Sequence, residues 1–174
     1  RLWGQDLRMV LSTQGPAERQ ELVGNFTGTV DMLPLRAWSE RPELTFTRGL
    51  TPASGRLTVP MSGEGDLRLV VESSMEGVTV DVPGLLTKAP EQPAPVQVQV
   101  DIGEVAGVQQ QRFTLDLKDR AQLLVLKRDG RVEGVDLAFG AQAQPAPAGQ
   151  FRVRGQVEQL DALAWGIFLT RLDQ

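Results

Sequence analysis

Residues 96–102 read Val-Gln-Val-Gln-Val-Asp-Ile, a strict alternation of apolar and polar side chains. Successive side chains of a β-strand point to opposite faces, so this run gives a strand with one apolar and one polar face. The same period of two recurs along the chain at 67–72, 78–82 and 113–118, and more weakly at 7–11, 44–46, 57–59, 135–139 and 151–153. The sequence therefore predicts a protein built of many β-strands.

Turn signals separate these strands. Asp129-Gly130 lies between two apolar runs, and Asp-Gly favours a tight hairpin because both central residues of a type I′ turn need positive φ. Further breaks are expected at 62–65, 75–77 and 103–109. Two proline-bearing stretches, 83–95 and 143–148, are predicted to be loops or extended crossings, because proline donates no hydrogen bond to a sheet. The pattern favours an antiparallel meander.

One short C-terminal helix is expected to begin after Asp161, where Ala164, Trp165, Phe168, Leu169 and Leu172 form one apolar stripe. A shorter helical turn is predicted from Pro34 to Glu40, since proline is tolerated in a first turn.

These two helical positions belong to an internal repeat. Residues 28–38 and 155–165 share five identities in eleven positions at an offset of 127, including Trp38 and Trp165. We interpret each copy as a strand, a leucine and a helical turn that inserts its tryptophan into apolar surface. Residues 1–174 are accordingly expected to be a single segment of a longer, elongated β protein.

Composition excludes most enzyme chemistry. The chain of 174 residues has no His, Cys or Tyr, which removes imidazole bases, thiolate nucleophiles and histidine zinc sites. The formal net charge of −4 argues against a nucleic-acid partner. The chain begins at Arg1 without an apolar leader, and its longest apolar stretch, 162–169, is far shorter than the roughly 20 residues that span a bilayer. We expect a mature segment whose membrane anchor lies outside it.

Carboxylates are the remaining catalytic candidates. Asp116 with Asp119, and Asp129, Glu133 and Asp136, cluster in sequence, and paired carboxylates serve glycosidases. Asp116, however, belongs to the polar face of an alternating strand, and Asp129 is explained by its turn. We therefore expect no catalytic residue, no metal and no cofactor, with a glycan hydrolase as a weak alternative.

The alternating strands leave two architectures open. In a closed β-sandwich or barrel, two apolar faces cover each other and the pattern is purely structural. In an open, curved sheet the same faces line a trough. Periodicity alone does not separate the two arrangements, and on pattern alone it favours the closed one.

Two stretches carry a family resemblance. Residues 72–83, Glu-Ser-Ser-Met-Glu-Gly-Val-Thr-Val-Asp-Val-Pro, precede a proline-rich crossing that contains Lys88. Residues 134–140, Gly-Val-Asp-Leu-Ala-Phe-Gly, are followed by Gly149-Gln-Phe-Arg-Val-Arg-Gly155 and by Leu160, Asp161 and Trp165. Together they resemble the YhdP-type branch of the AsmA-like bacterial envelope proteins. Met75 and Gly84 depart from that pattern, which usually has leucine and proline there.

The resemblance implies an all-β fold, a curved antiparallel meander forming a half-open, taco-like sheet, and a function without catalysis. It implies a section of a periplasmic lipid conduit that shields phospholipid acyl chains between the inner and outer membranes of a Gram-negative bacterium. Its partners would be phospholipid, adjoining segments of the same chain and the inner membrane through an anchor. The alternative is a closed β-sandwich scaffold or a protein-binding module of the envelope. The side chains expected to line the apolar trough are Leu67, Leu69, Val71, Val78, Val80, Val82, Val96, Val98, Val100, Ile102, Phe113, Leu115 and Leu117.

Overall fold

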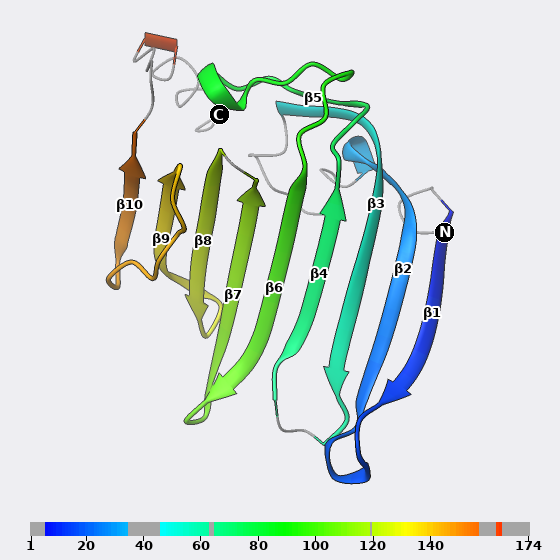
Figure 1. Ribbon diagram of the computed structural model, residues 1–174. Coiled ribbons are helices and arrows are strands. Elements are labelled where there is room, and N and C mark those ends of the chain that lie inside the picture. The colour runs from blue at the N-terminus through cyan, green and yellow to red at the C-terminus, as the bar shows by residue number, and fades with distance from the viewer. Residues whose placement is uncertain (1–5, 35–45, 63–64, 119, 157–162, 165–174) are drawn as a thin grey trace.

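The computed structural model describes residues 6–34, 46–62, 65–118, 120–156 and 163–164. Within these ranges the chain forms one ten-stranded sheet of order β1-β2-β3-β4-β6-β7-β8-β9-β10, and β5 pairs only with β3 (Figure 1). The strands are β1 (Leu7–Gln14), β2 (Glu21–Asp31), β3 (Thr47–Pro60), β4 (Leu67–Ser73), β5 (Val78–Val80), β6 (Val96–Val105), β7 (Val108–Leu117), β8 (Ala121–Arg128), β9 (Arg131–Phe139) and β10 (Gln150–Gly155). The predicted all-β fold with an open, mostly antiparallel sheet is confirmed.

The pairs from β1 to β9 follow the expected antiparallel order. The last pair departs from the predicted meander, because β10 runs parallel to β9. A parallel neighbour needs a crossover, and residues 140–149 return along β9 before β10 begins (Figure 1). The proline stretch at 143–148 is this extended crossing, as its composition predicted.

The turns explain where strands end. Asp129 and Gly130 have φ of 48° and 75°, so the predicted type I′ hairpin between β8 and β9 is confirmed. The β6–β7 turn is tighter than expected: only Ala106 and Gly107 lie in it, also at positive φ. Gly103, predicted to be part of this break, is a strand residue that pairs with Gln110. The carboxylate of Asp66 occupies the space that a side chain at this position would need.

The longest missed element is β2, for which the sequence indicated only the portion after Gly28. Its apolar residues are separated by Gly24 and Gly28, which weakens the alternation. Gly24 and Gly28 share one face of β2 with Leu22 and Phe26, so glycine replaces the apolar residue at two positions of an otherwise regular strand.

Helix is sparse. The described residues include the short 3-10 helices η1 (Ala17–Arg19) and η3 (Gly84–Leu86). Met32–Pro34 are helical after β2, and Leu163 and Ala164 are helical after β10. The rest of the predicted helices, and both repeat tryptophans, Trp38 and Trp165, lie outside the described residues.

Candidate functional site

The sheet separates an apolar face from a polar one. Residues paired directly across neighbouring strands share a face, and rows such as Leu57–Leu69–Val100–Phe113–Val125 cross the sheet without a polar member. We call the resulting surface the apolar face. Its apolar side chains are Leu7, Met9, Leu11, Leu22, Phe26, Val30, Ala53, Leu57, Val59, Leu67, Leu69, Val71, Val96, Val98, Val100, Ile102, Phe113, Leu115, Leu117, Ala121, Leu123, Val125, Val135, Leu137, Phe139, Phe151 and Val153.

Most of this apolar face retains contact with solvent. Its central side chains on β4, β6, β7 and β8 are mostly half-buried rather than buried. Exposure rises toward both sheet edges, to 59% for Leu11 on β1 and 68% for Phe151 on β10. Among the described elements, each strand packs beside its neighbours in the sheet, and no second layer covers this face (Figure 1). So large an exposed apolar surface is typical of a binding surface.

Ten of the predicted trough residues lie together on the apolar face: Leu67, Leu69 and Val71 on β4, Val96, Val98, Val100 and Ile102 on β6, and Phe113, Leu115 and Leu117 on β7. Val78, Val80 and Val82 do not join them in the ladder. Val78 and Val80 form β5, whose partner is the first part of β3, and Val82 follows it. Val78 is fully buried, because β5 leaves the ladder between β4 and β6 and folds into a separate segment.

The apolar face is wider than the sequence indicated. It includes Phe26 and Leu57 toward one edge and Leu123 and Leu137 toward the other. The alternation at 135–139 and 151–153 was visible, but nothing in it showed which strands pair. The run 121–126 has apolar residues on both faces, which hid its period of two.

Glycines shape the surface around Phe26. A side chain on Gly55 would overlap the ring of Phe26, and one on Gly24 would press on Leu11. Gly55 pairs with Phe26 across β2 and β3, so the ring lies over bare backbone. The large side chain of Phe26 thereby covers the one position where Gly55 leaves the backbone of β3 bare.

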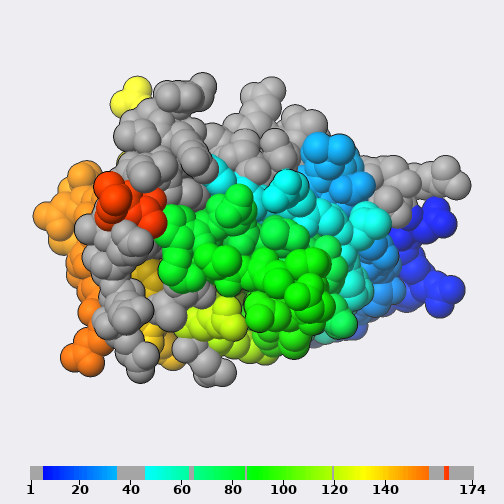
Figure 2. All heavy atoms as spheres, turned by 90° about the horizontal axis from the view of Figure 1, so that it is seen from above, coloured from blue at the N-terminus to red at the C-terminus, as the bar shows by residue number. Residues whose placement is uncertain are grey.

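A capping segment, residues 74–95, lies across one end of the strands between β4 and β6. It is closed by backbone hydrogen bonds from Ala94 to Ser74, from Gly77 to Pro90 and in both directions between Val80 and Lys88. Seen from this end, the segment covers the middle of the sheet (green spheres, Figure 2). The central strands of the sheet are therefore covered by the capping segment at this end.

Lys88 holds the capping segment together from within. Its side chain is 3% exposed, and Nζ donates to the carbonyl oxygens of Val78 at 2.7 Å and Ala89 at 2.9 Å. Burial lowers the pKa of Lys88, and the charges of Glu91 and Glu76 act in the opposite direction. The lysine of the predicted proline-rich crossing thus has a structural role.

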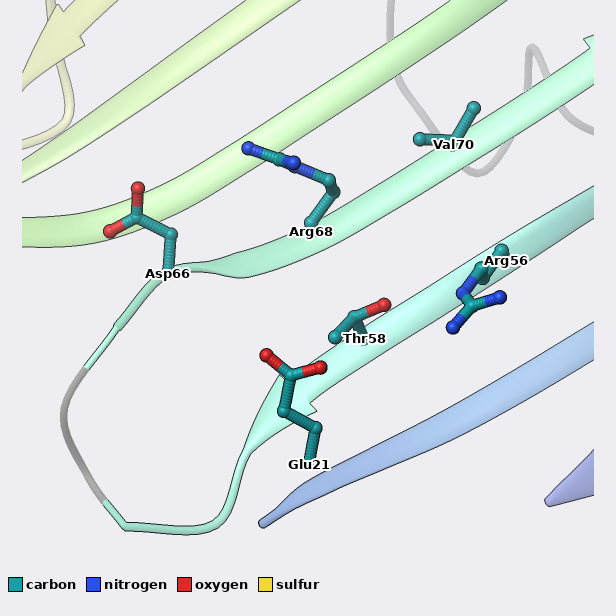
Figure 3. A pocket seen from close by; sticks show the side chains of 6 residues that line it. All are labelled: Glu21, Arg56, Thr58, Asp66, Arg68 and Val70. Carbon is teal, nitrogen blue, oxygen red and sulfur yellow. The ribbon is translucent and has the colours of Figure 1, made fainter. Parts of the chain in front are cut away.

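On the polar face, charged side chains of β2, β3 and β4 line a pocket of about 500 Å³ (Figure 3). Its lining residues are Glu21, Arg56, Thr58, Asp66, Arg68 and Val70. Arg68 Nε donates to Asp101 Oδ1 at 2.6 Å, and this hydrogen bond and charge raise the pKa of Arg68. Two arginines and two carboxylates balance one another here, which makes this a solvated surface rather than a strongly charged site.

The comparison with protein families agrees with these features. A family model described as YhdP protein matches residues 1–174. The chain belongs to the YhdP family. This is a family of bacterial envelope proteins related to lipid transport, and it is not known for an enzymatic activity. Comparisons with curated proteins and with solved structures gave no match.

The carboxylates of this YhdP-family chain have structural partners. Asp136 is fully buried on the polar face, where its carboxylate accepts from Arg152 Nε at 2.6 Å, Arg154 Nη2 at 3.0 Å and the amide of Gln144 at 2.7 Å. Burial alone would raise the pKa of Asp136, but the bonds from both arginines and from Gln144 hold it well below its usual range. A carboxylate so fixed is a poor general acid or base.

Three of the other candidate carboxylates also have partners. Asp116 accepts a long hydrogen bond from Gln122, Asp129 accepts from the amide of Gln109, and Glu133 forms an ion pair with Arg128 at 3.2 Å. Asp119 lies outside the described residues. Within the described ranges no group of three or more potential ligands is placed to hold a metal ion.

In the described part of this YhdP-family chain, no helix has the length and apolar character to cross a membrane.

Proposed function

We propose that this chain is a non-enzymatic section of a periplasmic lipid conduit, and that its apolar face shields phospholipid acyl chains between the inner and outer membranes. The observation that carries the proposal is an apolar face that extends over nine strands of one sheet and stays half-exposed. Membership of an envelope family related to lipid transport supports the same conclusion.

The energetic reason is the cost of moving hydrocarbon through water. A methylene contributes about 0.8 kcal/mol, so two acyl chains with about 30 methylenes would cost more than ~20 kcal/mol unshielded. A continuous apolar surface offsets this cost at every position. Because valine, leucine and phenylalanine present similar chemistry along the face, neighbouring positions bind with similar free energy and the lipid meets no deep trap.

The borders of the apolar face favour movement across the strands over movement along them. The capping segment lies across the strands at one end, whereas the apolar face continues to the exposed side chains of β1 and β10. We expect lipid to pass from strand to strand across the sheet, entering and leaving at these two edges. Adjoining segments of the same protein would meet the sheet there, and the inner-membrane anchor would lie in such a segment.

Site-specific photo-crosslinking in the full chain tests this function. A photoreactive amino acid at Val98 or Leu115 points to the apolar face, and one at Gln99 or Thr114 points to the opposite face of the same two strands. We expect phospholipid adducts by mass spectrometry at 98 and 115 and few at 99 and 114. Equal adducts on both faces contradict the proposal, and protein adducts in place of lipid favour a protein-binding module.

Substitutions give an independent measurement. Val98→Asp and Leu115→Asp place a charge among acyl chains and are expected to reduce the phospholipid that co-purifies with the chain. Gln99→Asp and Thr114→Asp are the matched controls, because they add the same group one residue away on the polar face. Retention of lipid by all four variants would count against the assignment.

A further inference from the structure

One region of the apolar face is polar. On β7 and β8 the cross-strand pairs on this face run Leu117–Ala121, Leu115–Leu123, Phe113–Val125 and then Gln111–Lys127. The ladder between the two strands has no register shift, so Gln111 and Lys127 share the face of the three apolar pairs. The polar pair stands at the hairpin end of the strands, opposite the capping segment.

Both side chains are available to a ligand. Gln111 is half-buried and contacts Gln109 through a long hydrogen bond of 3.4 Å. Lys127 is also half-buried, and within the described ranges it forms no ion pair or side-chain hydrogen bond. The nearby arginine Arg128 points to the other face, where it pairs with Glu133. A lysine beside two glutamines offers one positive charge and several N–H donors, the groups that bind a phosphate. The carboxylate of Glu104 lies one pair further toward the β6–β7 hairpin, opposite Gln109.

The apolar stretch of β7 between this polar pair and the capping segment is long enough for a lipid tail. Leu117 lies six positions after Gln111, and at roughly 3.4 Å per position this distance is about 20 Å. One leaflet of a bilayer has a hydrocarbon depth of about 15 Å, half of the ~30 Å core. A phospholipid with its headgroup at Lys127 would therefore find apolar side chains along its tails as far as the capped end.

We infer that Lys127, with Gln111 and Gln109, is the contact for the headgroup phosphate of the carried phospholipid, and that the acyl chains run along β7 and β8 toward Leu117 and Ala121. The inference rests on the proposed function and adds to it an orientation and a headgroup chemistry. The ligand is a phospholipid rather than free phosphate, because the charge borders an apolar surface of lipid length.

The test compares two lipids that differ only in the headgroup. Binding of phosphatidylglycerol and of diacylglycerol with the same acyl chains is measured for the full chain, for Lys127→Glu and for Lys118→Glu. Lys118 is exposed directly after β7, at the capped end, so its variant makes the same charge change at the wrong place. We expect Lys127→Glu to weaken phosphatidylglycerol binding about fivefold, the upper end for one partly screened ion pair. Binding of diacylglycerol should change by less than about twofold.

The orientation has its own measurement. A phosphatidylglycerol with a diazirine at the acyl terminus should label the region of Leu117 and Ala121, and labelling centred on Gln111 and Lys127 would overturn the proposed direction. If Lys127→Glu and Lys118→Glu weaken phosphatidylglycerol binding equally, the inferred headgroup contact is refuted, but the proposed function is not. If the unmodified chain binds neither lipid, the proposed function fails together with this inference.

Discussion

The two faces of the sheet differ in what they contribute to the fold. The apolar face is made of valine, leucine and phenylalanine, yet most of its side chains remain half-exposed. The polar face holds fully buried residues, among them Val23, Asp136 and Ala138, and the crossover 140–149 passes over it. Hydrophobic residues usually stabilise a fold by being covered. In this chain much of the covering lies on the polar face, and the apolar face stays largely half-exposed.

The largest effect is expected from removing the buried carboxylate. Asp136→Asn takes the negative charge from Arg152 and Arg154, which also hold the crossover through the carbonyl oxygens of Gln144 and Gln142. Breaking a buried ion pair by removing one partner costs about 3 kcal/mol or more. Urea unfolding should show a loss of this size, with β10 and the crossover exchanging amide hydrogens first.

Asp116→Asn is the matched control for this substitution. Asp116 lies on the same face, is half-buried and accepts only a long hydrogen bond from Gln122. A loss below about 1 kcal/mol is expected there. Equal losses in the two variants would show that Asp136 has no special part in holding the edge of the sheet.

The same carboxylate predicts how stability depends on pH. Its pKa is lowered in the folded chain, so its contribution is present above the unfolded pKa of about 3.9 and is lost as pH falls through and below that value. Urea midpoints measured between about pH 6 and pH 3 should fall more steeply for the natural chain than for Asp136→Asn. Parallel curves would contradict this account.

The contrast between the faces also shows what the sequence was able to predict. Alternation revealed β4, β6 and β7, because each has one apolar and one polar face. It did not reveal that Asp136 is buried, since an aspartate on the polar side of a strand looks solvated until a crossover covers it. The direction of β10 was equally hidden, because the length of residues 140–149 permits a return in either sense. Val78, Val80 and Val82 show the reverse case, a regular alternation whose strand pairs outside the main ladder.

A smaller effect is expected on the apolar face itself, at Gly55. Alanine there would overlap the ring of Phe26 and the carbonyl oxygen of Val70, and overpacking of this kind costs about 2 kcal/mol. Because position 26 is on a half-exposed surface, a smaller side chain there has room to shift away from the added methyl group at position 55. Phe26→Leu should therefore recover part of the loss in the double variant, and calorimetric unfolding of all three proteins measures the coupling. Strict additivity of the two losses would show that the ring does not lie on Gly55.

A small change in stability, together with a loss of bound lipid, is expected at Leu123. Leu123 and Leu124 are consecutive residues of β8, one half-exposed on the apolar face and the other 5% exposed beside Asp136 on the polar face. Leu124→Ala should cost about 3 kcal/mol, as for a core leucine, whereas Leu123→Ala should cost about 1 kcal/mol because little of its surface is buried by the fold. Lipid recovered with the folded chain should rank the two variants in the opposite order, since only Leu123 belongs to the apolar face, the surface that we propose contacts the acyl chains. If Leu123→Ala destabilises the chain as strongly as Leu124→Ala, the apolar face is a core covered by protein, and the conduit loses its physical basis.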